Sequence, residues 1–593
     1  MKRQFVHILL LALCYSVAAS CSKSDDPELD PDSGGVGQSQ TLQLTPVGKL
    51  NQGTPVINSH ADVTARSSLK MDYRSYVEIG SSQVQVAAPV YPRVKKMANG
   101  RYILFYHNNQ IGADSYYVRS SDLLTWTGGD RVFARYSIID QSGASNERRF
   151  SNCNGLVLAN GDVLAVASYR ANANYKTLKK DNGLILRRST DNGETWSNPV
   201  EIYQGTNWEP HLLQLPSGEI HCYFTESRTD IADYNSGVGL IISNDNGYTW
   251  TPSFGNEPYR VIRKKFGEKD GVGLFTDQMP GVIKLNNSNQ LVAALETYYD
   301  GVYYHISMAY SDNNGQWPHL TINEEGPADR HNFIYLGAAP SLAQFPSGET
   351  LLSYNASSRF TLRLGDATAR TFGEAYDPFP KTGYWGTLEP IDAHQIIGSM
   401  HTSGALMLAR FILNHRIVAT HRTVNVDGNN SEWSTTDDAL FVGEKSQAQA
   451  TLRCSCDNDN IYFLVEVLDQ AISQDDDVNI FLSPITATGD LNSDARRIKV
   501  AYSGLKSTDI YAGGWRTTDM NVSVKGAYDG TLSDNSDSDN GYLIEIAIPR
   551  SQLNLSSGTL LVNFALFDSQ GGEDAICNTA SKSLATWIPI SGL

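Results

Sequence analysis

Short apolar runs joined by a small polar turn recur about every 60 residues, and this period restricts the fold more than any other feature. The turns end at Gly100, Gly161, Gly218, Asn289, Gly348 and Gly404. Each turn joins two apolar runs, which is typical of a β-hairpin. A single hairpin unit cannot bury its own apolar face, so repeated units pack against one another in a ring. We therefore predict six four-stranded blades between residues 40 and 418, with the segment before Arg93 supplying the strand that closes the last blade.

A second motif lies between the hairpins. Residues 189–196 and 243–250 share the pattern S-x-D-x-G-x-T-W, and residues 120–126 and 311–317 are degenerate copies. The Asp accepts backbone hydrogen bonds within a tight turn, the Gly takes a positive φ, and the Trp packs between sheets. The pattern resembles the Asp-box of the sialidase-like propellers. This resemblance implies a structural motif on the face away from the functional site.

The period stops near residue 419, where strands with polar turns predict a β-sandwich over residues 419–593. The predicted fold class is therefore all-β, a six-bladed β-propeller followed by a β-sandwich. The sandwich resembles the family 9 carbohydrate-binding modules, which implies aromatic sugar contacts. Trp515 and Trp587 are the candidates, with packing in the core as the alternative. Because the period is complete before residue 419, we expect few core contacts to cross this boundary.

Metals and cofactors have few candidate ligands. Asp475, Asp476 and Asp477 could help to bind a structural calcium ion, although a solvated acidic turn is the alternative. No cysteine spacing resembles a zinc site, so no other cofactor is expected. Cys454 or Cys456 is a candidate disulfide partner for Cys577, with buried thiols as the alternative.

The N-terminus has the features of a targeting segment. Lys2 and Arg3 precede an apolar stretch that is too short to span a bilayer, and small residues lead into Cys21. This resembles a bacterial lipoprotein signal over residues 1–20, which implies a lipid on Cys21; ordinary secretion is the alternative. A Pro-, Asp-, Gly- and Ser-rich tether follows over residues 21–39. We expect a surface-exposed lipoprotein of the outer membrane.

The charge balance limits the partners. The chain of 593 residues carries 47 basic and 64 acidic residues, a net charge of −17. Nucleic acids and anionic membrane surfaces need basic patches, so this balance argues against both.

Three glutamates are candidate catalytic residues. Aligning the hairpins by their turns places Glu209 at the start of an inner strand, and Glu226 and Glu296 at the ends of second strands. These ends should converge on the mouth of the central cavity. Cleavage of a glycosidic bond needs one protonated carboxyl and one carboxylate, and crowding of acids in a cleft raises one pKa. The sequence therefore predicts a glycoside hydrolase.

The segments around these glutamates resemble the exo-arabinanases of the sialidase-like superfamily. The resemblance rests on residues 208–210, 223–226, 278–282 and 295–297. It implies an exo-acting, retaining hydrolase of a neutral glycan such as arabinan, with Glu296 as nucleophile. Glu226 and Glu209 both remain candidates for the general acid/base. The expected partner is an oligo- or polysaccharide.

Other polar and aromatic side chains are candidates for substrate binding: Arg93, Asn154, Trp208, His211, Asp277, Arg370 and Tyr384. A sialidase is the second hypothesis, since Arg93 and either Arg363 or Arg370 could belong to a three-arginine site for an acid sugar. Glu226 stands where another of those arginines would lie and would repel an anionic sugar, which favours a neutral substrate. The third hypothesis is a non-catalytic, glycan-binding lipoprotein.

Overall fold

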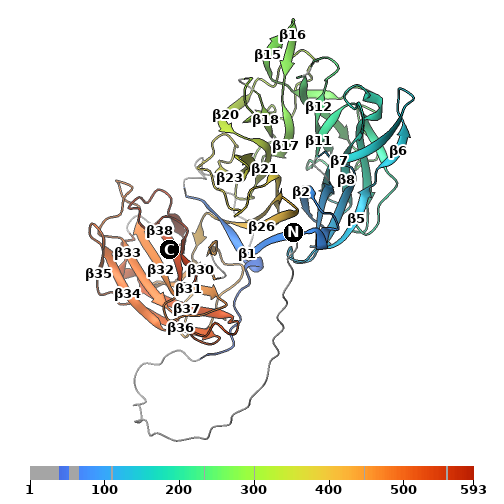
Figure 1. Ribbon diagram of the computed structural model, residues 1–593. Helices are drawn as coiled ribbons and strands as arrows, with labels where there is room; N and C mark the ends of the chain where they lie inside the picture. Colours follow the sequence, from blue (N-terminus) through green and yellow to red (C-terminus); the bar gives the residue numbers. More distant parts are fainter. Residues whose placement is uncertain are drawn as a thin grey trace, which may run out of the picture.

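A computed structural model describes residues 39–51, 66–108, 111–232, 234–298, 301–445, 448–555 and 559–593. Cys21, the predicted lipidation site, lies outside these residues. The described chain forms two β-domains (Figure 1), and its helices are α1 (Ser81–Val84), η1 (Val47–Lys49), η2 (Lys179–Asp181) and η3 (Arg550–Gln552). None of the helices in these segments has the length and apolar character needed to cross a membrane.

Over the described residues, six antiparallel sheets form the blades of a propeller, as the period predicts. Blade one comprises β2 (Pro89–Lys96), β3 (Tyr102–Asn108), β4 (Ser115–Ser120) and β5 (Thr127–Phe133). Blade two comprises β6 (Tyr136–Ile139), β7 (Ser145–Val157), β8 (Val163–Ala171), β9 (Gly183–Ser189) and β10 (Val200–Gln204). Blade three comprises β11 (Asn207–Gln214), β12 (Ile220–Ser227), β13 (Ser236–Ser243) and β14 (Tyr259–Ile262).

The remaining blades complete the ring. Blade four comprises β17 (Gln278–Lys284), β18 (Leu291–Thr297), β19 (His305–Tyr310) and β20 (Arg330–Leu336). Blade five comprises β21 (Ala338–Gln344), β22 (Thr350–Ala356) and β23 (Arg359–Gly365). Blade six comprises β24 (Tyr384–Pro390), β25 (Gln395–Thr402), β26 (Ala405–Asn414) and β1 (Ser68–Gly80). Because β1 pairs antiparallel with β26, the N-terminal segment closes the last blade as predicted. Blades two and five differ from the expected four strands.

Every inner strand contains a β-bulge, near its start in five blades and within β7 in blade two, and this feature positions the site. The bulge shifts the register of the inner strand against the second strand in each blade. Each bulge holds one non-glycine residue at a φ between 50° and 62°: Tyr91, Asn152, Glu209, Met279, Ala339 and Trp385. This left-handed backbone is costly for such residues and persists where the surrounding structure fixes it. These residues form a bulge ring at the mouth of the central channel.

The S-x-D-x-G-x-T-W segments form tight turns between the third and fourth strands. In the first, Asp191 Oδ1 accepts hydrogen bonds from Ser189 Oγ at 2.7 Å and from the Thr195 amide at 2.9 Å. The turn at Asp245 repeats these bonds at 2.8 Å each. Second strands end, and third strands begin, at the face of the bulge ring. The turns between third and fourth strands therefore lie on the opposite face.

The C-terminal domain is a sandwich of two sheets. One sheet contains β27 (Ile417–Val418), β32 (Asp477–Pro484), β33 (Arg496–Ala501), β34 (Gly504–Tyr511), β35 (Trp515–Thr517), β38 (Leu560–Asp568), β39 (Gly572–Ala575) and β40 (Ile588–Ser591). The other contains β28 (Thr420–His421), β29 (Ala439–Val442), β30 (Gln449–Cys456), β31 (Asn460–Leu468), β36 (Ser523–Asp529) and β37 (Gly541–Pro549). Their inner faces share one apolar core. The described cysteines, including Cys454, Cys456 and Cys577, are free thiols.

The boundary between the domains differs from the prediction. Residues 40–51, predicted as part of the propeller, lie against the sandwich: Leu42 and Leu44 pack with Leu464 and Leu543. One small apolar cluster also crosses the boundary between the domains. Ile412 of blade six packs in one apolar cluster with Phe441, because the β1–β26 edge presents apolar side chains that the sandwich covers. Figure 1 shows β1 and β26 beside the sandwich.

Candidate active site

Two glutamates from neighbouring blades lie at the mouth of the channel, close enough for the charge of Glu296 to act on Glu209. Glu209 is the bulge residue of β11, and its Oε2 accepts a hydrogen bond from Thr225 Oγ1 at 2.8 Å. Glu296 lies near the end of β18, where its Oε2 accepts a hydrogen bond from the Ala339 amide at 2.8 Å. The Met279 amide donates to Thr225 Oγ1 at 3.0 Å, which ties the two blades together. We call Glu209 and Glu296 the acid pair.

The two glutamates of the acid pair differ in pKa. Burial, followed by the negative charge of Glu296, raises the pKa of Glu209 to about 8. Burial also raises the pKa of Glu296, to about 7, although the hydrogen bond from Ala339 opposes this shift. Glu209 therefore keeps its proton at a higher pH than Glu296 does. Two carboxyls whose surroundings separate their pKa values can serve as a proton donor and a nucleophile.

Glu226, the other predicted acid/base, does not lie with the acid pair. Its side chain is 1% exposed, and its two oxygens accept hydrogen bonds from Arg260 Nε and Nη2 at 2.7 Å each. Successive side chains of a strand point to opposite faces, so Thr225 faces Glu209 and Glu226 points away. Of the two candidates that the sequence leaves open, the geometry therefore retains Glu209.

Three of the predicted binding residues line the channel below the bulge ring. Arg93 Nη1 donates to the carbonyl oxygens of Pro92 and Trp385, at 2.8 and 3.0 Å. Asn154 Nδ2 donates to the Pro210 carbonyl at 3.2 Å. His211 Nε2 donates to the Val282 carbonyl at 2.8 Å, and burial, with the charge of Lys95, lowers the pKa of His211 to about 4. His211 is therefore neutral near pH 7 and joins inner strands rather than moving protons.

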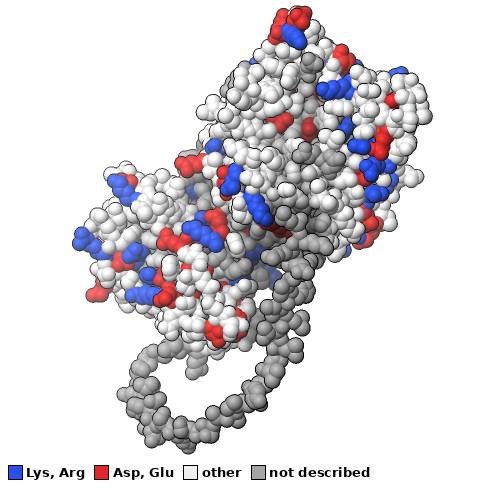
Figure 2. All heavy atoms as spheres, in the orientation of Figure 1, with Lys and Arg blue, Asp and Glu red and all other residues white. Residues whose placement is uncertain are grey.

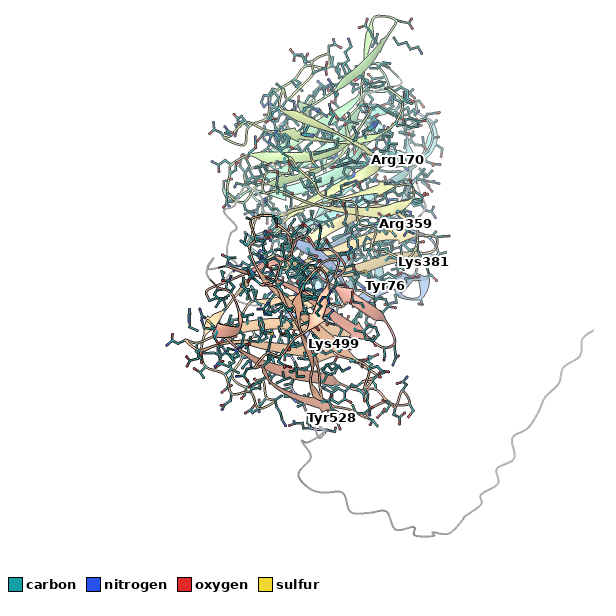
Figure 3. The ribbon with its side chains drawn as sticks, turned by 90° about the vertical axis from the view of Figure 1, so that its left-hand side faces the viewer. Tyr76, Arg170, Arg359, Lys381, Lys499 and Tyr528 are labelled. Carbon is teal, nitrogen blue, oxygen red and sulfur yellow. The ribbon has the colours of Figure 1, made fainter. Side chains whose placement is uncertain are left out.

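Trp208, also predicted, is half-buried directly beside Glu209 and rests on residues that the prediction did not name. The Arg170 guanidinium lies 4.6 Å from the centre of the indole ring, and the Tyr175 ring meets its edge at 5.6 Å. Arg170 is 6% exposed, and burial lowers its pKa to about 10. Its position at the end of the second strand of blade two was the available signal. Figure 3 shows Arg170 at the same edge of the propeller as Arg359 and Lys381.

The other predicted binding residues lie elsewhere. Asp277 is fully buried and accepts two hydrogen bonds from Arg330 at 2.8 Å, so this ion pair serves the fold. Arg370 pairs with Asp329 at 2.6 Å and stacks over Tyr310. Tyr384 is 48% exposed where the inner strand of blade six begins, so it reaches the rim of the site.

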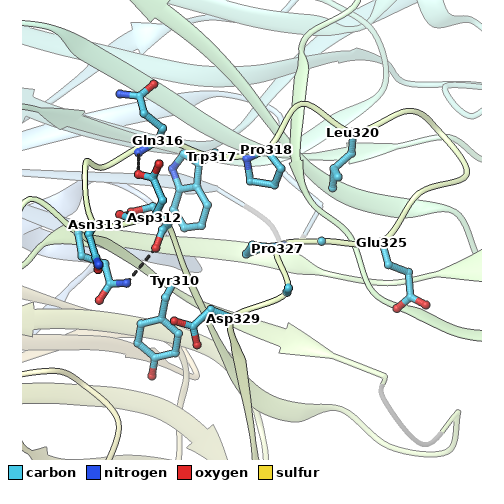
Figure 4. A pocket seen from close by; sticks show the side chains of 14 residues that line it. Tyr310, Asp312, Asn313, Gln316, Trp317, Pro318, Leu320, Glu325, Pro327 and Asp329 are labelled. Carbon is cyan, nitrogen blue, oxygen red and sulfur yellow. Dashed lines mark hydrogen bonds between the residues drawn. The ribbon is translucent and has the colours of Figure 1, made fainter.

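A separate hollow lies on the opposite face, beside the Arg370–Asp329 pair (Figure 4). It is lined by Tyr310, Asp312, Trp317 and Asp329. Asp312 accepts a hydrogen bond from the Gln316 amide at 2.7 Å inside the turn, and Asp329 is paired with Arg370. These carboxylates are committed to the fold, whereas the acid pair is not. The acid pair is therefore the better candidate for chemistry.

In the sandwich, Trp587 is 2% exposed and packs against Phe481 in an apolar cluster, so the core alternative holds for this residue. Because so little of its surface is exposed, Trp587 offers no ring face to a sugar. Trp515 is partly exposed at the sheet edge, with Tyr511 at 5.4 Å, and remains a candidate sugar contact.

Three buried carboxylates of the sandwich could hold a metal ion. One oxygen from each of Asp469, Asp476 and Asp568 lies within 4.8 Å of the others. Asp469 Oδ2 has no hydrogen-bond partner among the described residues, and burial raises the pKa of Asp469 to about 7. Of the predicted calcium ligands only Asp476 belongs to this cluster, because Asp475 is exposed and Asp477 pairs with Lys499. Carboxylate oxygens suit Ca²⁺.

We expect Ca²⁺ to raise the melting temperature of the full chain. An ion that binds only the folded state stabilises it by about 2.7 kcal/mol at 100 times its Kd. Differential scanning fluorimetry with Ca²⁺ or with a chelator measures the shift. Asp469→Asn should abolish the response, whereas the exposed neighbour substitution Asp475→Asn should leave it intact. Equal melting temperatures with Ca²⁺ and chelator would rule out the site.

Comparisons with known proteins agree with this architecture. Residues 426–587 match the family model described as carbohydrate family 9 binding domain-like. A search of curated proteins found no match. A solved protein of unknown function from Dyadobacter fermentans is 20% identical, with a TM-score of 0.44 over 59% of this chain and 100% of that one.

Two similar solved structures are enzymes. An α-L-arabinanase from Penicillium chrysogenum, solved with arabinobiose, is 18% identical, with a TM-score of 0.40 over 58% of this chain and 98% of that one. A Hadza microbial sialidase is 15% identical, with a TM-score of 0.40 over 55% of this chain and 66% of that one. These likenesses concern the fold. The chain is built as a six-bladed β-propeller followed by a β-sandwich, and the sandwich carries the match to the carbohydrate family 9 binding domain-like model.

Proposed function

We propose that the protein is an exo-acting, retaining glycoside hydrolase that cleaves a neutral glycan such as arabinan. The observation that carries the proposal is the acid pair: the half-buried Glu209 and the buried Glu296 belong to neighbouring blades and have separated pKa values at one channel mouth. The cavity below the bulge ring has a volume of about 50 Å³, which is too small for a glycan chain to pass through, and this supports the exo mode.

The reaction would proceed in two balanced steps. The Glu209 carboxyl gives its proton to the glycosidic oxygen as the bond from the anomeric carbon to that oxygen breaks. The Glu296 carboxylate attacks the anomeric carbon and forms an ester with it. Glu209, now a carboxylate, then takes a proton from water as the water oxygen attacks the same carbon. The ester bond breaks, and Glu296 returns as a carboxylate.

A neutral substrate is supported by how the cationic groups are used. Arg93 donates to two backbone carbonyls, and Arg370 lies at the opposite face in a pair with Asp329. Arg260 is already paired with Glu226, to which it donates a hydrogen bond. Arg170, beside Trp208, pairs with no carboxylate of the described residues, but a site for an acid sugar needs several such cations, so a sialidase is less well supported. On the face drawn in Figure 2, basic and acidic side chains are interspersed over both domains.

Turnover of arabinan oligosaccharides, aryl arabinosides and sialosides tests the proposal, and its pH dependence gives a specific expectation. Below pH 7 Glu296 becomes protonated and cannot attack; above pH 8 Glu209 loses the proton that the leaving oxygen needs. We therefore expect kcat/KM to follow a bell-shaped profile with its maximum between these values. With an aryl leaving group that departs without protonation, the decrease of kcat/KM above pH 8 should disappear. A profile that is flat from pH 5 to 9 would contradict this assignment.

The proposal also concerns the location of the protein, which we infer to be a surface lipoprotein anchored to the outer membrane through Cys21. It is supported by the residues that surround Cys21 in the sequence. Loss of detergent partitioning in Cys21→Ala is the corresponding test. If no glycoside is hydrolysed but glycans bind, the sandwich domain makes a non-catalytic, glycan-binding lipoprotein the better function.

A further inference from the structure

One interval of the repeat is longer than the others, and the extra residues form a hairpin. The turns at Gly218 and Asn289 are 71 residues apart, whereas the other intervals are 56 to 61 residues. The additional strands are β15 (Lys265–Lys269) and β16 (Val272–Phe275), between β14 and β17. Fourth strands end, and inner strands begin, at the face of the bulge ring, so the hairpin stands on the face of the acid pair. Figure 1 shows it projecting beyond the blades.

The hairpin completes a cluster of four aromatic side chains, which we call the aromatic rim: Tyr234, Phe266, Tyr298 and Tyr304. The ring centres of Tyr298 and Tyr304 are 3.9 Å apart. Phe266 lies 5.9 Å from Tyr298 and 6.0 Å from Tyr234. The Phe275 amide donates to the Tyr234 carbonyl at 3.2 Å and so fixes the base of the hairpin. The rim therefore joins the hairpin to the loops that flank β13 and β18.

The aromatic rim adjoins the acid pair. Tyr304 Oη donates to Gln278 Oε1 at 3.3 Å, and Gln278 is the register partner of Glu296. Tyr298 follows Glu296 by two residues, so it leaves the sheet on the same side. Burial raises the pKa of Tyr304, and the negative charges of both Glu296 and Glu209 add to this shift. The rim is therefore continuous with the proposed cleavage site.

The outer part of the rim is exposed to solvent. Tyr234 is 49% exposed, and the neighbouring Ile231 is 36% exposed. Exposed aromatic surface beside a polar cleft is typical of a ligand-binding groove, and a ring face offers a large apolar contact at low entropic cost. A projecting rim can touch only the part of a substrate that lies outside the channel mouth. For an exo-acting enzyme, that part is the chain on the leaving-group side.

We propose that the aromatic rim binds the sugar rings of the leaving glycan chain, so that the enzyme prefers a polysaccharide or long oligosaccharide to a single capped sugar. This inference rests on the proposed function. It assigns to the β15–β16 hairpin a role in recognition that the propeller fold does not require.

Chain-length dependence tests the proposal. Phe266→Ala and Tyr234→Ala should each lower kcat/KM for arabinan oligosaccharides roughly two- to tenfold, the range expected for the loss of one aromatic contact. Both variants should leave kcat/KM for an aryl arabinoside unchanged, because its leaving group does not reach the rim. Tyr234→Phe keeps the ring and should restore the oligosaccharide rate. Tyr248→Ala, a 67% exposed tyrosine of the opposite face, is the matched control.

Two outcomes would overturn the proposal: an unchanged ratio between the two substrates, or an equal loss on both, which would indicate a structural role. Melting temperatures of all variants identify any that fold poorly, and Phe266→Leu then replaces Phe266→Ala. If the wild-type chain hydrolyses no substrate, the proposed function fails separately. In that case calorimetric titration of the oligosaccharide into wild type and Phe266→Ala still tests whether the aromatic rim binds glycan. Equal affinities of the two proteins would refute this role.

Discussion

Glu296→Gln is expected to lower kcat by roughly 10⁴-fold while glycan binding persists, because the variant removes the nucleophile and keeps its shape. The Ala339 amide, which donates to Glu296 Oε2 at 2.8 Å, can donate equally well to an amide oxygen. Steady-state kinetics on an aryl arabinoside and calorimetric titration of an oligosaccharide measure the two properties separately. A parallel loss of turnover and binding would indicate a collapsed pocket, not a missing nucleophile.

Glu209→Gln provides the complementary result. Loss of a general acid lowers the rate about 10²–10⁴-fold, and this loss should be smaller for a better leaving group. Glu226→Gln is the matched control, since Glu226 is buried within the same blade but paired with Arg260. It should lower the melting temperature and leave kcat nearly unchanged. If Glu226→Gln instead lost activity as severely as Glu209→Gln, the assignment of the acid pair would be wrong.

The pKa shifts also give the sign of the stability change. Burial raises the pKa of Glu209 and Glu296 above the value of about 4.5 that a glutamate has when unfolded. Their ionised forms are therefore disfavoured in the folded state, and stability falls as the pH rises from 4.5 through about 7 and 8. Glutamine has no proton to lose. Both variants of the acid pair should thus melt at a higher temperature than wild type at pH 8, in keeping with a trade-off between stability and activity.

The period and the hairpin turns carry most of the information about the fold. They predict the blades, the closing strand and the convergence of Glu209 and Glu296, because turn residues and apolar runs are local signals. The error at Glu226 has a specific cause in the bulges. Glu226 pairs with Asn207, two residues before the bulge residue Glu209, whereas Glu296 pairs with Gln278, one residue before Met279. A difference of one residue turns a side chain to the other face, and turn positions alone do not resolve it.

Long-range pairs account for the remaining differences. Arg370 meets Asp329 through packing of neighbouring blades, and Asp469 and Asp568 join Asp476 from separate strands of the sandwich. No local pattern marks these partners. The sequence contains one signal of the aromatic rim, the 71-residue interval between two hairpin turns. This interval indicates an insertion but does not identify its contacts.

Removal of residues 422–593 is expected to destabilise blade six severely, because the sandwich covers the edge that closes the propeller. Ile412 is fully buried in a cluster with Phe441, and Asn414 exchanges two hydrogen bonds with the Phe441 backbone, at 2.9 and 2.7 Å. Asp72 of β1 is fully buried and accepts hydrogen bonds from Arg410 and from Gln449 of the sandwich. Each buried polar group left unsatisfied costs about 1–3 kcal/mol, and the exposed apolar edge adds to this.

Since β1 also closes the ring by pairing with β26, its loosening should spread to the whole propeller. The truncated chain should melt more than 10 °C below the full chain, on the order of several kcal/mol, and protease should cut it first within residues 66–80. Asn414→Ala in the full chain removes one junction contact and should give a smaller shift in the same direction. A truncated chain that melts with the full-length propeller and keeps its activity on aryl arabinosides would show that the junction is dispensable. The two domains would then be independent folding units despite the apolar cluster that joins them.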